Sequence, residues 1–271
     1  MTDYRIPWSN RSDKPGELGR HVNHDPQSRA FAHQPSSTVL QSKVWARHFP
    51  VLHQSVGACT GNAMLGAVYT GKLYDALSSE LKAKYPASQV VAQDVLYHLA
   101  TTLDSFVGTF PPIDTGSDGV SVSKAAQQLG LIAGYRHTFS LDDALAAVAN
   151  DSHVITGVNW YPAFDRPDAA GLVKLPAELG RPEGGHEFLV YGIDVDLELV
   201  LARNSWGAEW GLLGEFRFSF DDWGRLLEQA GDVTVPVPIT APKPKPTITL
   251  SWLERFERDV AQVIAWVKAR L

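Results

Sequence analysis

The chain has 271 residues, of which 44% are hydrophobic and 20% charged, and its formal net charge at pH 7 is −6. These values are ordinary for a globular protein of one large domain or two small ones, and the negative charge argues against a nucleic-acid-binding surface. No apolar run reaches the roughly 18 residues that a membrane helix needs, and the polar residues 1–16 contain no signal-peptide core.

The first part of the chain predicts an extended arm and then a helix. Residues 1–40 are polar and rich in Pro, His, Ser and Arg, so we expect an arm rather than a domain. Residues 44–52 predict a strand or extended segment that leads into the loop before the single cysteine, Cys59. Over residues 60–79, apolar side chains recur at near-helical spacing and predict a helix.

Further helices are expected toward the middle of the chain. The apolar pattern predicts helices over residues 89–104 and 121–129, separated by a turn-rich loop at 111–119. A capping signal at Ser140 predicts another helix that continues through Ala149.

The pattern changes in the second half of the chain. Short runs rich in Val, Leu and Phe predict strands over residues 153–158, 188–193, 198–202 and 215–220. Helices followed by strands predict an α+β domain of two lobes, which we assign to residues 41–235. A cleft between two lobes is a favoured place for a substrate.

The C-terminal part predicts a linker and a helix. Residues 236–250 are rich in Pro and Lys, which is typical of a stiff, extended linker. Residues 251–271 carry apolar side chains at alternating spacings of three and four and predict an amphipathic helix. Docking on the domain, self-association and binding of a partner fit this helix equally well.

The single cysteine is placed for nucleophilic chemistry. Cys59 follows a Gly-Ala turn and stands at the start of the helix expected over residues 60–79, where the helix dipole favours a thiolate. His186, after two glycines, could take the thiol proton. Asn204 could accept the ring N–H of His186 and fix its tautomer. We therefore expect an imidazolium–thiolate pair at these residues.

Other residues could support this chemistry. Gln54 and the backbone N–H of Cys59 could donate hydrogen bonds to the oxyanion of a tetrahedral intermediate. Trp206 could cover the bond between His186 and Asn204 from water. His21 and His24 lie near an aspartate but complete no ligand set, so we expect no metal site.

These motifs resemble the motif set of papain-like cysteine peptidases, over roughly residues 44–220. His186 and Asn204 follow Cys59 at separations just below and within the family range of about 130–150 residues. The matching motifs are Gln54, Gly57-Ala58-Cys59, Gly185-His186 and Asn204-Ser205-Trp206-Gly207, followed by Trp210-Gly211 and Gly214.

The resemblance implies a papain-like α+β fold, with a helical lobe that carries Cys59. A β-rich, barrel-like lobe would carry His186 and Asn204, with the active-site cleft between the lobes. It implies thiol-dependent hydrolysis of peptide or protein substrates through an acyl-enzyme, without a cofactor. The loop around Gly116 and Ser117 resembles the cleft wall of the family, whose backbone pairs with an extended peptide.

The sequence departs from the family pattern beside the cysteine. Thr60 replaces the usual aromatic residue, and Gln54 lies five residues before Cys59 instead of six. Val56 replaces a half-cystine, and a chain with one cysteine forms no internal disulfide, so we expect the cytoplasm or another reducing compartment. These variants resemble bacterial or bacteriophage members of the family.

Glu187 is a further departure, because a small apolar residue is common at this position after the histidine. In the family this position can line the pocket for the residue second from the cut on the acyl side. The resemblance therefore implies a substrate-binding role for Glu187, together with Trp206, and the hypothesis of a preference for a basic side chain.

Two other functions fit the sequence. The departures at Thr60 and Gln54 motivate a catalytically inactive binding or assembly module that attaches through the helix expected at residues 251–271. An amidase or transpeptidase that acts on cell-wall peptides would use the same acyl-transfer residues.

Overall fold

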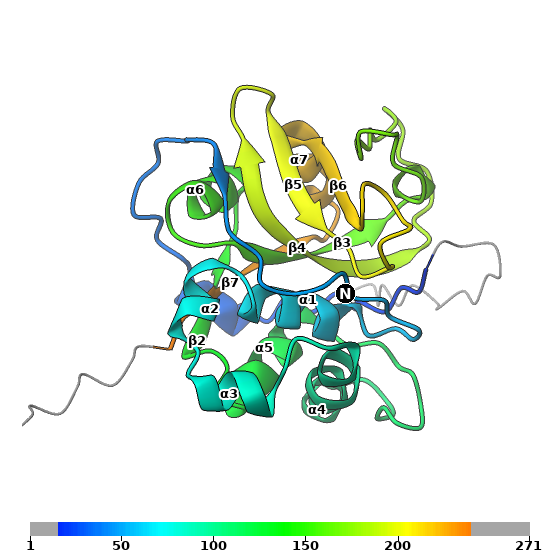
Figure 1. Ribbon diagram of the computed structural model, residues 1–271. Helices are drawn as coiled ribbons and strands as arrows, with labels where there is room; N and C mark the ends of the chain where they lie inside the picture. The colour runs from blue at the N-terminus through cyan, green and yellow to red at the C-terminus, as the bar shows by residue number, and fades with distance from the viewer. Residues whose placement is uncertain (1–15, 240–271) are drawn as a thin grey trace, which may run out of the picture. The chain divides into compact units, whose positions relative to one another are not determined.

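The computed structural model describes residues 16–239, which Figure 1 draws in colour. Residues 1–15 and 240–271 lie outside the described part, and with them most of the expected linker 236–250 and all of the expected helix 251–271. Within the described part, no helix is long and apolar enough to cross a membrane. The proposed limits of the arm, the domain and the linker stay predictions.

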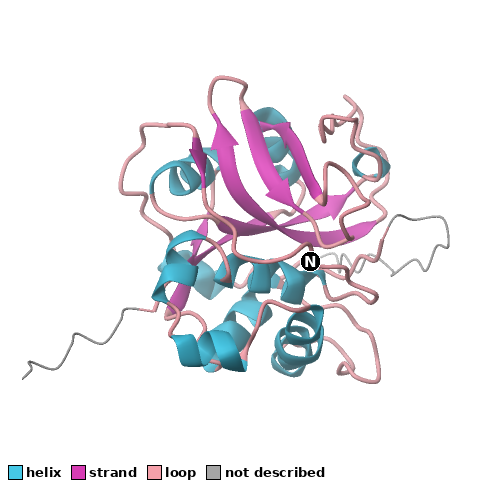
Figure 2. Ribbon diagram, in the orientation of Figure 1, coloured by secondary structure: helices cyan, strands magenta, loops and turns pink. Residues whose placement is uncertain are grey.

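The helices between Cys59 and Gln128 gather on one side of the described chain, as Figure 2 shows in cyan. The helix expected over residues 60–79 begins at Cys59 but is interrupted, because Thr70 is extended and Gly71 has a φ of +48°. The helices expected over residues 89–104 and 121–129 are confirmed. The bounds are α1 (Cys59–Val68), α2 (Gly71–Ala76), α3 (Ser79–Lys84), the π-helix η2 (Val91–Tyr97), α4 (His98–Leu103) and α5 (Gly119–Gln128).

The described residues also form a seven-stranded sheet in the order β2-β7-β3-β4-β5-β6, with β1 paired to β4. Every strand pair is antiparallel. The four expected strands are confirmed as β3 to β6, whereas β2 and β7 were not expected. The bounds are β1 (Lys43–Val44), β2 (Gly134–Thr138), β3 (Val154–Trp160), β4 (Gly184–Asp194), β5 (Leu199–Arg203), β6 (Glu215–Ser219) and β7 (Asp232–Val237).

The remaining helices are α6 (Leu141–Asn150), α7 (Phe220–Glu228) and the short 3-10 helices η1 (Pro26–Phe31) and η3 (Pro162–Phe164). The capping prediction is confirmed, because the Ser140 side chain accepts a hydrogen bond from the N–H of Asp143 at 3.1 Å. Residues 44–52 form almost no strand, since β1 ends at Val44. Both α6 and α7 contact the sheet.

Two separate hydrophobic cores give the described chain its two lobes. One core lies among the strands and is rich in aromatic side chains, including Trp160, Phe188 and Phe218. The other lies among α1, η2, α4 and α5 and includes Met64 and Leu96. The predicted α+β architecture of a helical and a β-rich lobe is therefore confirmed.

Strand β4 lies between the two cores and contributes to both. Phe188 and Val190 belong to the aromatic core of the β-rich lobe, whereas Leu189 and Tyr191 belong to the core of the helical lobe. This follows from strand geometry, because successive side chains point to opposite faces of a sheet. The first residues of β4 therefore lie at the boundary between the lobes.

The aromatic core predicts a large loss of stability when it is truncated. Phe218 is fully buried against other aromatic rings, so Phe218→Ala should lower the free energy of unfolding by about 3–5 kcal/mol. Val107 is 91% exposed, and Val107→Ala should change the free energy of unfolding by less than about 0.5 kcal/mol. Urea unfolding of the wild type and both variants measures these changes in free energy. Equally small losses in the two variants would contradict the prediction.

Candidate active site

Cys59 is the first residue of α1, and its side chain is completely buried. The loop before it is fixed by Asp114, whose carboxylate accepts the Gly57 N–H at 2.8 Å and the Tyr97 hydroxyl at 2.6 Å. The backbone N–H groups of Thr60 and Glu187 lie near enough to the thiol to lower its pKa. Because Glu187 follows His186 in β4, the sulfur lies beside the part of β4 that carries the imidazole.

His186 and Asn204 are joined by a buried hydrogen bond of 2.7 Å between Nε2 and Oδ1. The amide oxygen can only accept, so Nε2 carries the ring proton and Nδ1 is left as a base. Among the described residues, Nδ1 has no hydrogen-bond partner. The rings of Trp160 and Trp206 lie 4.8 and 4.9 Å from the imidazole, centroid to centroid. The imidazole is thus held in one tautomer in an apolar setting.

Gln54 reaches the same site despite its unusual spacing in the sequence. Its backbone N–H donates to the carbonyl of Ser205 at 2.8 Å, and the Ser205 hydroxyl donates to its side-chain oxygen. These contacts orient the amide so that Nε2 donates to the carbonyl of Glu17 at 2.9 Å and to that of Val56 at 3.1 Å. Trp206 Nε1 donates to the same Glu17 carbonyl at 3.0 Å.

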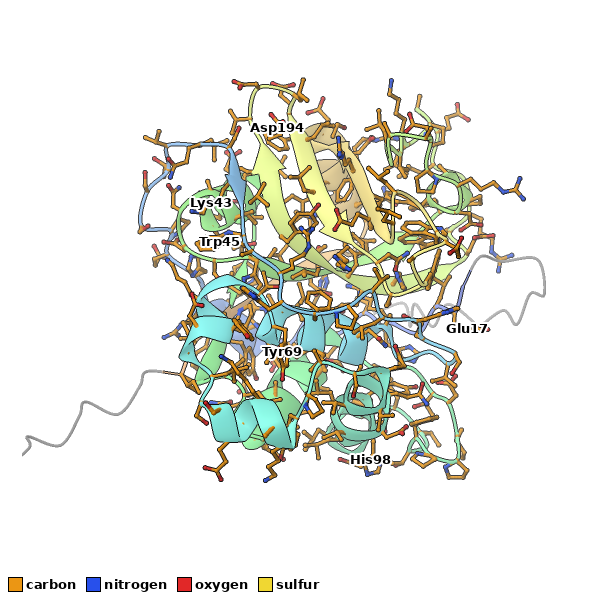
Figure 3. All side chains as sticks on the ribbon, in the orientation of Figure 1. Glu17, Lys43, Trp45, Tyr69, His98 and Asp194 are labelled. Carbon is orange, nitrogen blue, oxygen red and sulfur yellow. The ribbon has the colours of Figure 1, made fainter. Side chains whose placement is uncertain are left out.

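The arm passes directly over these residues. Figure 3 labels Glu17 beside the loop that leads into α1, in agreement with its contact to Gln54. Two residues later, Gly19 donates to the Gly185 carbonyl at 3.1 Å, and its N–H also lies near enough to the thiol of Cys59 to lower the pKa of the thiol. We call residues 17–21 the arm segment. Its Gly19 lies against Gly57 and near the thiol of Cys59.

The arm segment pairs with the loop in which sequence reasoning placed substrate-binding residues. Ser117 donates to the Gly19 carbonyl at 2.9 Å and accepts from the His21 N–H at 2.7 Å. Gly116 has a φ of +73°, and a Cβ there would lie 2.3 Å from the Gly19 carbonyl oxygen. The Ser117 backbone therefore pairs with an extended segment, which in this structure belongs to the chain itself.

Glu187 is fully buried and faces Arg20 of the arm segment. The Arg20 guanidinium forms an ion pair with Asp232 and donates to the Ala230 carbonyl at 2.9 Å. Sequence reasoning missed both Arg20 and Asp232. Arg20 lies in a polar arm without any pattern, and Asp232 begins the unexpected strand β7.

Burial sets the protonation states of the site. It raises the pKa of the Cys59 thiol to about 12, although the N–H groups of Glu187, Thr60 and Gly19 act in the opposite direction. Burial also lowers the pKa of His186 to about 4, against the effect of the Asn204 hydrogen bond. With the arm segment in place, burial thus favours a neutral thiol and a neutral imidazole over the expected ion pair.

The histidines of the arm take other roles. The rings of His21 and Phe106 lie 4.2 Å apart, centroid to centroid, with their planes tilted by 31°. Asp25 accepts the Gln27 N–H at 2.9 Å as the cap of η1. Within residues 16–239 no cluster of three or more His, Cys, Asp or Glu side chains could hold a metal ion.

No protein-family model matches this sequence, and no curated protein matches it. Among solved structures, xylellain, a cysteine protease from Xylella fastidiosa, is similar with a TM-score of 0.56 and 21% identity, over 86% of this chain and 100% of xylellain. A digestive procathepsin L 3 from the larval midgut of Tenebrio molitor is similar with a TM-score of 0.55 and 15% identity, over 83% of this chain and 76% of that one. The chain has the papain-like fold.

The buried imidazole predicts a pH dependence of stability. In the folded chain the pKa of His186 is about 4, below the unfolded value of about 6.5, so the unfolded chain binds more protons between these pH values. The free energy of unfolding should therefore fall as the pH drops through this range, by up to about 3 kcal/mol from this residue.

Urea titrations of the wild-type and His186→Asn chains across this range measure that contribution. The variant should show the flatter profile. Other buried groups, such as His153 with its pKa lowered to about 3, act equally in both proteins and cancel in the comparison. Parallel profiles would show that His186 is not held neutral.

Proposed function

We propose that this protein hydrolyses peptide bonds through a covalent thioester on Cys59. The observation that supports this most strongly is the buried 2.7 Å bond between His186 and Asn204, which leaves Nδ1 unpaired on the strand beside the sulfur. A base held in a single tautomer next to a lone thiol has the arrangement that nucleophilic catalysis needs. The papain-like fold agrees with this reading.

In the proposed mechanism, Nδ1 of His186 takes the proton of the Cys59 thiol and the sulfur attacks the carbonyl carbon of the peptide bond. The carbonyl oxygen becomes an oxyanion that accepts from Gln54 Nε2 and from the backbone N–H of Cys59. The imidazolium then protonates the leaving amine as the C–N bond breaks. Water, deprotonated by the same imidazole, attacks the thioester and releases the sulfur.

One donor of the proposed oxyanion site, Gln54 Nε2, is already engaged with a carbonyl group. Gln54 Nε2 lies 2.9 Å from the carbonyl oxygen of Glu17, within the range of a normal hydrogen bond. The amide is held by Ser205 rather than by the bound segment, so it would keep its orientation when a substrate replaces the arm segment. This preorganisation is the feature that makes such donors effective.

The substrates of this proposal are peptides or proteins. A chain with a single cysteine needs no oxidising environment to fold, which suits the cytoplasm or another reducing compartment.

Replacement of the proposed nucleophile should abolish hydrolysis. We expect Cys59→Ala to lower kcat/KM on a peptide library by at least about 10⁴-fold, while circular dichroism stays unchanged. The assay is run with the wild-type arm and with Arg20→Ala, which removes the buried ion pair of the arm segment. Turnover that survives Cys59→Ala would exclude the mechanism.

A thiol-reactive epoxide provides an independent readout in the same two backgrounds. An active site should react at Cys59 far faster than a free thiol does. Absence of both labelling and hydrolysis in both backgrounds would favour the non-hydrolytic binding module. Incubation with peptidoglycan fragments and, separately, with an unfolded protein, followed by product analysis, separates the two enzymes. A cell-wall amidase would cleave the fragments, and a peptidase would cleave the unfolded protein.

The oxyanion role predicts a graded effect. Gln54→Ala should lower kcat by about 10²- to 10³-fold with little change in KM, because the lost bond forms fully only in the transition state. Gln128→Ala, an exposed glutamine on α5, is the matched control and should leave both constants unchanged. A loss that appears only in KM would place Gln54 in ground-state binding instead.

A further inference from the structure

An acidic pocket lies where the arm segment meets β4 and β7. Its carboxylates are Glu187, which is fully buried, and Asp232, with Asp118 close enough to act on Glu187 electrostatically. Asp118 is satisfied within α5, because its oxygens accept the N–H and hydroxyl of Ser121 at 2.8 and 2.9 Å. Glu187 and Asp232 are thus the carboxylates available to a ligand. We call the site around these two carboxylates the acidic pocket.

The acidic pocket holds one cation in this structure. Arg20 is only 4% exposed, forms an ion pair with Asp232 and donates to the Ala230 carbonyl. Its Nε and Nη1 have no hydrogen-bond partner among the described residues, and the same is true of both carboxylate oxygens of Glu187. With Arg20 in place, the Glu187 carboxylate therefore still has hydrogen-bond acceptors that are not used.

Two glycines make room for a long side chain. A Cβ on Gly157 would lie 2.5 Å from Nε of Arg20 and 2.9 Å from oxygens of Glu187 and Asp232. A Cβ on Gly119 would lie 2.8 Å from Glu187 Oε1. Any larger residue at these positions would collide with the groups of the pocket, so the absence of side chains here keeps the pocket open.

The charge of the acidic pocket calls for a cation. Two carboxylates buried side by side are costly unless a positive group compensates them. Burial and the neighbouring Asp232 raise the pKa of Glu187 well above its usual range, and Arg20 acts against both. The acids lie on strands of the fold, whereas the cation comes from the coil before the first helix or strand of the described chain.

The main chain around Arg20 is bound as a peptide would be. Arg20 donates its N–H to the Gly185 carbonyl at 2.9 Å, and its two neighbours, Gly19 and His21, pair with Ser117. These contacts use only backbone atoms, and an extended peptide with glycine at the position of Gly19 could form them. A peptide that replaced the arm segment would place one of its side chains in the acidic pocket.

We propose that the acidic pocket recognises an arginine or lysine side chain of the substrate, and that Arg20 occupies it in cis until a substrate takes its place. This proposal rests on the proposed peptidase function and names its substrate class. The competing interpretation is that the ion pair with Asp232 only anchors the arm and selects no substrate.

The test uses the full chain with Arg20→Ala, which empties the pocket of its own cation. Fluorogenic peptides are compared in pairs that differ only by arginine or citrulline, its uncharged near-isostere, at each position in turn. At one position we expect kcat/KM to favour arginine by about 10- to 100-fold, as hydrogen bonds to charged groups typically give. Arg20→Gln replaces Arg20→Ala if the latter does not fold.

Matched variants test which carboxylate selects the cation. In the Arg20→Ala background, Asp232→Asn and Glu187→Gln should each lower the arginine-to-citrulline ratio by about 10-fold or more. Asp221→Asn, an exposed aspartate on α7, should leave the ratio unchanged. Arg29→Ala, an exposed arginine of the same arm, should not reproduce the effect of Arg20→Ala.

A binding assay separates this proposal from the hydrolase proposal. Fluorescence anisotropy measures the same peptides on the chain with Cys59→Ala and Arg20→Ala. Tighter binding of arginine peptides that depends on Asp232 supports the pocket even if no peptide is cleaved. Cleavage without any preference for arginine, or equal binding of arginine and citrulline peptides, would overturn the proposal.

Discussion

The alternation of β4 between two hydrophobic cores is the constraint on which the site depends. Successive side chains of a strand point to opposite faces, so neighbouring residues of β4 are sent toward different lobes. His186 shares its face with Phe188 and lies among tryptophans, whereas Glu187 shares its face with Leu189 and turns toward α5. A shift of one residue in register would exchange the imidazole and the carboxylate.

The pairing of β4 with β3 fixes this register and the space beside it. Val158 lies opposite His186 and Gly157 opposite Glu187. The residue across from the carboxylate therefore has no side chain, and that is where the guanidinium of Arg20 lies. The pairing of β3 with β4 thus positions both the proposed base, His186, and the acidic pocket. The residues proposed for catalysis and for substrate selection are therefore held by the same strand pair.

The sequence could predict Cys59, His186 and Asn204 of the candidate site because each lies in a local motif, but it could not predict that the arm segment lies over them. Cys59, His186 and Asn204 sit in short motifs with recognisable spacing, and β3 to β6 follow apolar patterns. Strands β2 and β7 were missed because Gly134, Asp232 and Pro236 interrupt such patterns. The acidic pocket joins parts of the chain far apart in sequence, and the raised pKa of the thiol reflects its burial in the folded chain.

The arm segment is a guide to the backbone path of a ligand but not to every side chain. A Cβ on Gly19 would lie 2.0 Å from the carbonyl oxygen of Gly57, so a residue with a side chain cannot follow this path over the sulfur. A Cβ on Gly185 would lie 2.1 Å from the carbonyl oxygen of Arg20. The cleft therefore contacts its occupant mainly through close backbone approach. Close backbone contact leaves little room to select side chains at these positions, so under our proposal the acidic pocket that Arg20 fills discriminates between substrates.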